Sequence, residues 1–263
     1  MHHADPADAC SATPGHSEAG ILRARTGDTI GGQGYAALNA DAARTAFDVG
    51  GAGSLSGAAW SAFAASWDNL RPDEFMADKG RYRLRRHAVW RLEPGDPSPR
   101  RAPHQPHYQS LNNNPLNGGV QRWFAPVDDA VAKGPALDAL LCGARSVFDR
   151  LVPGAVWHVE AHQFRIQARA DEAGKPTPEG MHRDGVDYVM VTLIGRENVA
   201  GGVTAIRIDG QEGEAASFTL TEPLDSVLLD DRRVWHGVTP VVPLDAAREG
   251  HRDVLVLTFR RLE

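Results

Sequence analysis

The first half of the chain changes its hydrophobic periodicity several times. From Ala36 to about Leu70 the pattern is helical, and Trp60, Phe63 and Trp67 recur at spacings of three, four and seven that predict one buried face. From Arg81 to Leu92 apolar and polar residues alternate instead, which predicts a strand with its arginines mostly on the polar face. We expect that basic face to be exposed or to meet carboxylates.

Residues 94–119 are rich in Pro, Asn and Gly and are expected to form a long loop. Loops of this length often act as lids over a functional site. Gly134 and Pro135 then begin an amphipathic helix that runs to about Leu151 and ends before Pro153. We expect this helix to pack its apolar stripe on a sheet.

Short β-rich segments separated by Gly, Pro, Asp and Asn follow as far as the C-terminus. The eight candidates are Trp157–Ala168, a short segment entering His182, Asp187–Ile194, Thr204–Ile208, Ser217–Leu220, Ser226–Leu229, Val234–Val241 and Asp253–Arg260. Strands in this number without intervening helices predict an α+β, mainly β protein: a double-stranded β-helix (jelly roll, cupin-like) with N-terminal helices packed on one sheet.

We therefore expect a single domain over residues 21–263. Its helical and loop part would cover residues 21–153, and the jelly-roll core residues 154–263. Residues 1–20 are polar, small and poor in large apolar groups, so they are expected to be a disordered leader.

Composition narrows the class of partner. The net charge of −6 and the pI near 6.0 give no general attraction to nucleic acid or to an anionic membrane. No apolar run approaches the roughly 18 residues of a membrane span, and the leader lacks the pattern of a secretory signal. These features predict a cytoplasmic protein with a small-molecule substrate, without nucleic-acid or membrane partners, and they are compatible with a homodimer.

Three residues have the types and order of a metal site. His182 and Asp184 are two positions apart, so on an extended backbone their side chains point the same way. His236 follows 52 positions later (236 − 184) in a segment that a jelly roll can fold back beside them. Two histidines and one carboxylate form the facial triad of non-haem Fe(II) oxygenases, with three coordination positions left open.

Each residue of this triad also has an ordinary structural interpretation. His182 could lie in a solvated turn, Asp184 could cap a turn beside Gly185, and His236 could be a core histidine. Arg252, 16 positions after His236 (252 − 236), favours the functional interpretation. Its guanidinium could pair with the distal carboxylate of 2-oxoglutarate, whereas the structural alternative is a pair with a surface acid.

Three segments carry a resemblance to a known family: HRDGVDYVMVTLIGRENVAGG, DSVLLDDRRVWHGVTPV and RDVLVLTFRR. They resemble a bacterial family of 2-oxoglutarate/Fe(II) dioxygenases that includes L-isoleucine 4-hydroxylase, other free L-amino acid hydroxylases and BsmA-like proteins. The segments HQFRI and NPLNGGVQRWF are also similar. On the matching positions, the resemblance implies that His182, Asp184 and His236 bind Fe(II) and that Arg252 binds 2-oxoglutarate.

The resemblance also suggests further contacts. The strand that carries HQFRI flanks the cofactor in this architecture, so Gln163 or Arg165 could contact 2-oxoglutarate or the substrate carboxylate. These two side chains share one face of the strand, and a structural salt bridge is the alternative for Arg165. Asp230 or Asp231 could support His236, or could cap a turn.

Together these features predict an enzyme that uses dioxygen, Fe(II) and 2-oxoglutarate to hydroxylate or sulfoxidise a free L-amino acid, with release of succinate and CO2. Two alternatives remain open at this stage. One is a non-catalytic module that binds 2-oxoglutarate or an amino acid in a stress response. The other is a metal enzyme of the same fold that does not use 2-oxoglutarate, for which Arg252 is the discriminating residue.

Overall fold

The computed structural model describes residues 17–48, 53–114 and 116–263. Most of the expected disordered leader therefore lies outside the described residues. The helices are α1 (Glu18–Gln33), α2 (Ala40–Phe47), α3 (Gly57–Ala65), α4 (Asp129–Ala132) and α5 (Pro135–Leu151), with a 3-10 turn η2 (Ser66–Asn69). None of the helices in the described part of the chain is long and apolar enough to cross a membrane.

Antiparallel strands form the rest of the fold. They are β1 (Tyr35–Leu38), β2 (Arg71–Pro72), β3 (Arg83–Leu92), β4 (Arg100–Arg101), β5 (Val156–Ala168), β6 (Tyr188–Glu197), β7 (Val199–Gly201), β8 (Val203–Ile208), β9 (Ala216–Thr219), β10 (Ser226–Asp230), β11 (Val234–Val238), β12 (Val241–Pro243) and β13 (Gly250–Leu262).

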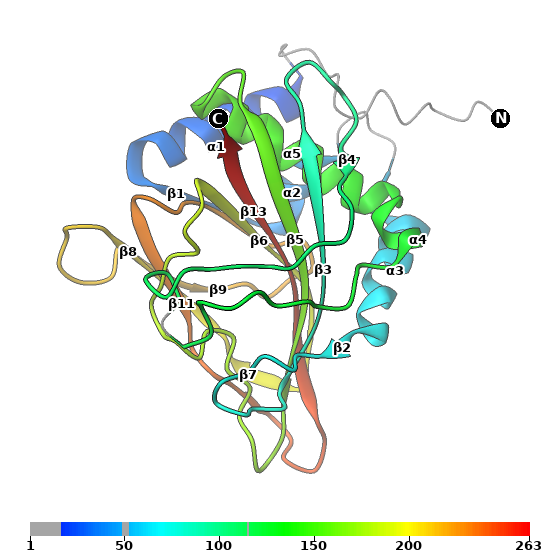
Figure 1. Cartoon of the computed structure of the whole chain (residues 1–263), viewed down its shortest axis with the longest axis vertical. Helices are drawn as coiled ribbons and strands as arrows, with labels where there is room; N and C mark the ends of the chain where they lie inside the picture. Colours follow the sequence, from blue (N-terminus) through cyan, green and yellow to red (C-terminus); the bar gives the residue numbers. More distant parts are fainter. Residues whose placement is uncertain (1–16, 49–52, 115) are drawn as a thin grey trace.

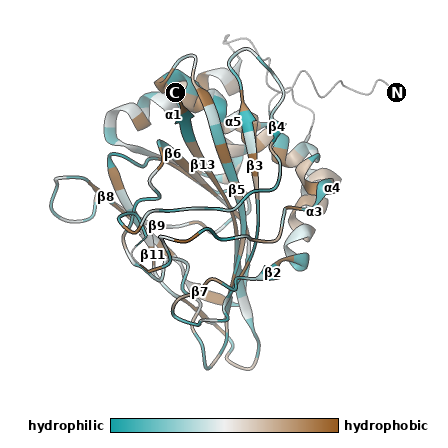
Figure 2. Ribbon diagram, in the orientation of Figure 1, coloured by the Kyte–Doolittle hydropathy of each residue, from teal (hydrophilic) through white to brown (hydrophobic). Residues whose placement is uncertain are grey.

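One large sheet runs in the order β1-β10-β6-β13-β5-β3-β2, with β4 paired to β3. Two smaller sheets, β11-β8-β9 and β12-β7, complete a jelly roll. Side chains along each strand of the large sheet point alternately to its two faces. In Figure 2, hydrophilic and hydrophobic colours follow one another along β5 and β13.

The helices gather on one face of the large sheet (Figure 1). Helix α5 begins with Pro135 at its first position, as the sequence predicted, and buries its apolar stripe on that face. The Phe148 ring stacks on Tyr188 with a centroid distance of 4.7 Å and meets Phe259 edge-on at 4.9 Å. The opposite face of β5 and β13 remains available for a cavity.

One expectation about the N-terminal half needs correction. Residues 36–38 were expected to be helical, but they belong to β1, which pairs with β10 from Tyr35 opposite Leu229 to Leu38 opposite Ser226. Alanine favours a helix more than any other residue, but this local preference is small and pairing at the edge of the sheet overrides it. Strands β1 to β3 thus join the large sheet although they precede residue 154; β3 was predicted as a strand over residues 81–92, whereas β1 and β2 were not.

The segment expected to be one strand over Val234–Val241 is divided into β11 and β12. Pro240 lies between them and has no backbone N–H to donate to a neighbouring strand. The carbonyl of Pro240 instead accepts the N–H of Gly202, whose φ of +72° is a left-handed conformation that glycine adopts readily. The division leaves β11 free to pair with β8 and to present His236.

Candidate metal and cofactor site

The backbones of His182 and His236 form an isolated antiparallel pair. The His182 N–H donates to the His236 carbonyl at 2.9 Å, and the His236 N–H returns a bond of 3.0 Å. His182 lies in the connection between β5 and β6, and His236 lies on β11. This pair brings the two rings to a centroid distance of 4.4 Å, although 54 positions (236 − 182) separate them in sequence.

Asp184 completes the group, and the ligand atoms of its three residues lie within 4.8 Å of one another. Its carboxylate oxygens lie 3.3 Å from His236 Nε2 and 3.8 Å from His182 Nε2. Burial opposes ionisation of this carboxyl, but the neighbouring His236 and His182 outweigh burial and hold the pKa of Asp184 below its ordinary value. The carboxylate is therefore the form present at neutral pH.

The ring nitrogens suit a metal. His182 Nδ1 lies 3.1 Å from the Gly180 carbonyl, which can only accept, so the proton is on Nδ1 and the lone pair is on Nε2. His236 Nε2 is buried and has no hydrogen-bond partner among the described residues. Two imidazole nitrogens and one carboxylate thus converge as a two-histidine, one-carboxylate ligand set.

Asp231 fixes the loop that carries Asp184. Its carboxylate accepts the backbone N–H groups of Asp184, Gly185 and Val186 at 2.9, 2.7 and 3.0 Å. Its Oδ1 also lies 3.9 Å from His236 Nε2. Asp230 instead contacts Arg232, so of the two candidates for support, Asp231 is the one that reaches the site.

Arg252 lies on β13, and its side chain lines the same cavity as the triad. The residue is 2% exposed, and its Nε and Nη2 have no hydrogen-bond partner among the described residues. Burial and the nearby Arg196 lower the pKa of Arg252 to about 10, so the guanidinium is still charged at neutral pH. A buried, unpaired cation is costly, and a ligand carboxylate would satisfy it.

Gln163 and Arg165 lie on the other face of β5. Gln163 donates to Ser66 Oγ at 2.9 Å, and the Arg165 guanidinium binds both Asp253 oxygens at 2.9 and 2.7 Å as well as Asp68. The structure does not bring either side chain to the triad. The expected shared face is present, but it is the face that η2 covers, and Arg165 makes the salt bridge that was the alternative.

The triad and Arg252 open into a cavity of about 470 Å³. The segment between β4 and α4 crosses this face of the sheet (Figure 1), and its residue Gln109 donates to Asp184 Oδ1 at 3.2 Å. Gln109 Oε1 in turn accepts a bond of 2.9 Å from Arg122. No sequence pattern pointed to Gln109, because its neighbours in the loop have no periodicity.

Sequence and structure comparisons agree with this geometry. The sequence model of the 2OG-Fe dioxygenase family matches residues 64–258, which is more than half of the chain. The chain therefore belongs to the 2OG-Fe dioxygenase family. Family membership implies Fe(II) and 2-oxoglutarate as cofactors, and the triad and the unpaired Arg252 fit both groups.

Individual relatives add detail. A 3(1)-hydroxy-L-isoleucine 4-dioxygenase from Pantoea ananatis is 25% identical over 60% of this chain and 65% of its own length. The bifunctional enzyme flvA from Aspergillus flavus is 32% identical over 55% of this chain and 20% of its own length. The chain thus spans less than two thirds of either curated relative. The crystal structure of a bsmA homolog from Methylobium petroleophilum is 37% identical, with a TM-score of 0.81, and covers 90% of this chain and 92% of that one.

Proposed function

We propose that this protein is an Fe(II)- and 2-oxoglutarate-dependent dioxygenase that hydroxylates or sulfoxidises a free L-amino acid. One oxygen atom of O2 would enter the amino acid and the other would enter succinate, while 2-oxoglutarate loses CO2. The observation that carries the proposal is the presence, in one cavity, of a convergent triad and a buried arginine without a partner.

The chain's own residues have distinct tasks in this proposal. His182, Asp184 and His236 hold Fe(II) and leave open positions for ligands. Arg252 binds the distal carboxylate of 2-oxoglutarate and so fixes the orientation of the oxo acid. When bound, iron and dioxygen supply the oxidising chemistry, and the cavity holds the substrate next to that chemistry.

Two observations support an amino acid as the substrate. The Pantoea ananatis relative is named for a reaction of a hydroxylated L-isoleucine, and a cavity of about 470 Å³ lies in the ordinary range for small-molecule sites. Arg122 also lines this cavity and is 2% exposed, and its Nε has no partner among the described residues. We assign Arg122 to the substrate carboxylate. A cytoplasmic location, where free amino acids and 2-oxoglutarate are available, belongs to the same proposal.

A panel experiment tests this function. The protein is loaded with Fe(II) and given 2-oxoglutarate, O2 and each free L-amino acid, and mass spectrometry measures succinate and products heavier by one oxygen. We expect both products in equal amounts for at least one amino acid, and neither product from Asp184→Ala. Binding of 2-oxoglutarate without turnover of any amino acid would favour the non-catalytic module, and absence of 2-oxoglutarate binding would favour a metal enzyme of another type.

A further inference from the structure

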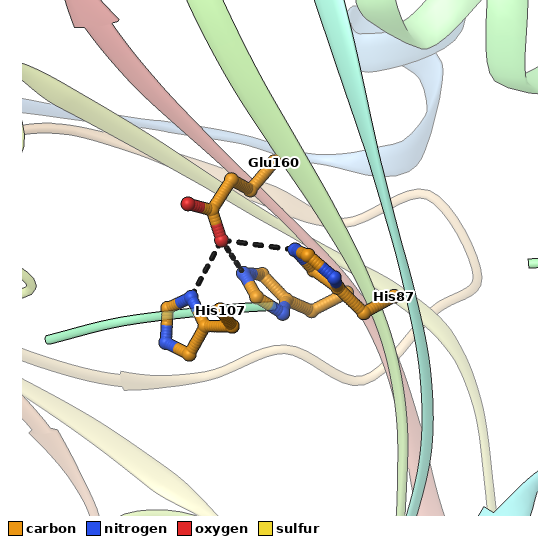
Figure 3. A group of neighbouring side chains, drawn as sticks. His87, His107 and Glu160 are labelled. Atoms are coloured by element: carbon orange, nitrogen blue, oxygen red, sulfur yellow. Dashed lines mark hydrogen bonds and ion pairs between the residues drawn. The ribbon is translucent and has the colours of Figure 1, made fainter. Parts of the chain in front are cut away.

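A second group of metal-ligand side chains lies beside the triad. His87, His107, Glu160 and His162, here called the histidine–glutamate cluster, place their ligand atoms within 4.8 Å of one another. Figure 3 shows the His87 and His107 rings directed at one oxygen of Glu160. Glu160, His107 and His162 line the same cavity as the triad. Neither the triad nor the proposed cofactor contacts use any of these four residues.

The fold holds this cluster in place. In the pairing of β3 with β5, His87 lies opposite His162, and Glu160 is two positions from His162 on the same strand face. His107 comes from the loop, where its backbone exchanges two bonds with Arg122, at 3.0 and 2.9 Å. The convergence is therefore built from two paired strands and an anchored loop, rather than from long surface side chains.

The ligand atoms lie close enough together for one ion to contact them, and without an ion the His87 and His107 nitrogens are at hydrogen-bond distance from Glu160. His87 Nε2 lies 3.0 Å, His107 Nδ1 2.5 Å and His162 Nε2 3.5 Å from Glu160 Oε2. Ligands bonded to zinc at about 2.0–2.1 Å in a tetrahedron are about 3.3 Å apart. In the triad, the carboxylate-to-imidazole distances are 3.3 and 3.8 Å, so the cluster is at least as compact as the iron ligands of the same chain.

His162 has a different role from the other two histidines. Arg85 Nη2 lies 2.7 Å from His162 Nδ1, and a guanidinium can only donate, so Nδ1 keeps its lone pair. The proton of the neutral ring is then on Nε2, which faces Glu160 and cannot bind a metal. Arg85 is itself held by Asp73 at 3.5 Å. His162 thus orients the carboxylate, and three ligands remain.

We propose that His87 Nε2, His107 Nδ1 and Glu160 Oε2 form a second site, for a divalent transition ion of the zinc type, next to the iron site. Two imidazoles and a carboxylate are a known three-ligand set for zinc, with the fourth position left to water or a ligand. Burial lowers the pKa of His87 to about 4, so its ring is in the neutral, metal-binding form at pH 7.

An ion in this site would fix the position of the loop between β4 and α4, which crosses the cavity face of the sheet. His87 and Glu160 belong to the large sheet, whereas His107 belongs to the loop, so an ion bound to all three ties the loop to the sheet. Two residues further along the loop, Gln109 donates to the triad carboxylate of Asp184. Occupation of the second site therefore steadies a residue that contacts the first.

Metal counting tests the proposal without substrate or 2-oxoglutarate, so its outcome is independent of the proposed function. A triad-deficient variant, His182→Ala with His236→Ala, is dialysed against micromolar Zn(II), and zinc per chain is measured by mass spectrometry. We expect the cluster site to remain loaded in this variant and to lose one zinc per chain when Glu160→Gln is added. Zinc held elsewhere on the chain stays bound in both, so their difference counts only this site.

His158→Ala is the matched control, because His158 Nε2 lies 3.4 Å from the other carboxylate oxygen, Glu160 Oε1, and is outside the ligand set. It should leave the zinc count unchanged. Circular dichroism of each variant verifies folding. Glu160→Gln is used instead of replacing His87 and His107 because it keeps the shape of the side chain. Equal zinc in the triad-deficient protein with and without Glu160→Gln would overturn the proposal.

Hydrogen exchange of the loop supplies the second readout. Zn(II) added to the triad-deficient variant should slow amide exchange in residues 104–124, and should leave it unchanged when Glu160→Gln is present. If Glu160→Gln instead raises the KM for the amino acid in the wild-type background while zinc binding stays the same, the cluster recognises the substrate ammonium group and the metal assignment is wrong.

Discussion

The carboxylate of Asp231 accepts the backbone N–H of the triad residue Asp184 at 2.9 Å, and it takes the next two N–H groups as well. One buried side chain thereby sets the position of a proposed metal ligand 47 residues earlier in sequence (231 − 184). The geometry of the proposed metal site consequently depends on a residue outside the triad.

Asp231→Asn should weaken Fe(II) or Co(II) binding by about 10- to 100-fold, which is the usual effect of losing such a support. The amide can accept fewer of the three N–H bonds, so the Asp184 loop loses its fixed position. Asp230→Asn is the control, because Asp230 contacts Arg232 and the turn rather than the triad. Isothermal titration with Co(II) measures the metal affinity of both variants. Equal Co(II) affinities of Asp231→Asn and Asp230→Asn would contradict the supporting role of Asp231.

Arg252 and Arg165 lie on paired strands, but we expect opposite effects of their replacement on 2-oxoglutarate affinity and on stability. Arg252→Met should weaken 2-oxoglutarate binding by about 10- to 100-fold, since a hydrogen bond to a charged group contributes about 1.5–3 kcal/mol. It should not destabilise the protein without ligand, because the removed charge has no partner among the described residues. Arg165→Met should leave 2-oxoglutarate affinity unchanged and lower stability, because Asp253 loses its partner. Calorimetric titration and urea unfolding measure the two effects.

Arg122→Lys tests the substrate assignment. Lysine keeps the charge but loses the planar fork, so the KM for the amino acid should rise by about tenfold or more, with little change in the KM for 2-oxoglutarate. Steady-state kinetics with the best substrate of the panel gives both constants. A larger effect on 2-oxoglutarate than on the amino acid would reverse the assignment of Arg122 and Arg252.

The lowered pKa of Asp73 predicts that the free energy of unfolding depends on pH. Burial raises the pKa of its carboxyl, but the Arg85 and Arg83 guanidiniums and the Phe75 N–H outweigh burial and leave that pKa below the ordinary 3.8. A lowered folded-state pKa means that the stabilisation is present above about pH 4 and is lost as the pH falls through the folded-state value.

Asp73→Asn should therefore cost about 3–5 kcal/mol of unfolding free energy at pH 7, because two buried guanidiniums lose their anion. The deficit should shrink as the pH falls below about 4. Asp41→Asn, in a solvent-exposed pair with Arg44, is the control and should cost less than about 1 kcal/mol. Urea unfolding at pH 7, 5 and 3.5 measures this, and a deficit that grows toward acid would contradict it.

The strand pattern of the second half was predictable because alternation and turn residues are local signals. Trp157–Ala168 and Asp253–Arg260 correspond to β5 and β13, and Ser226–Leu229 corresponds to β10. Strand β7 was missed, since it has three residues and ends in glycine. Its existence depends on pairing with β12, which no local pattern encodes.

In the candidate site, too, some residues were predictable from the sequence and others were not. The order of His182, Asp184 and His236 is a sequence signal, and the backbone pair between the two histidines places them together. The histidine–glutamate cluster carries no such signal, because its members come from β3, from a loop and from β5. The predicted basic face of the strand over residues 81–92 meets a carboxylate, which is one of the two outcomes that the sequence allowed: Arg83 and Arg85 are buried against Asp73.

An anaerobic titration of 2-oxoglutarate into Fe(II)-loaded protein tests the central claim most directly, because chelation of the oxo acid to Fe(II) produces a visible charge-transfer absorption. We expect a saturable absorption with one equivalent per chain in the wild type and in Asp230→Asn, a higher dissociation constant in Arg252→Met, and no absorption in Asp184→Ala. Wild-type protein that binds Fe(II) but develops no absorption, or Asp184→Ala that develops the full absorption, would contradict the assignment of this site.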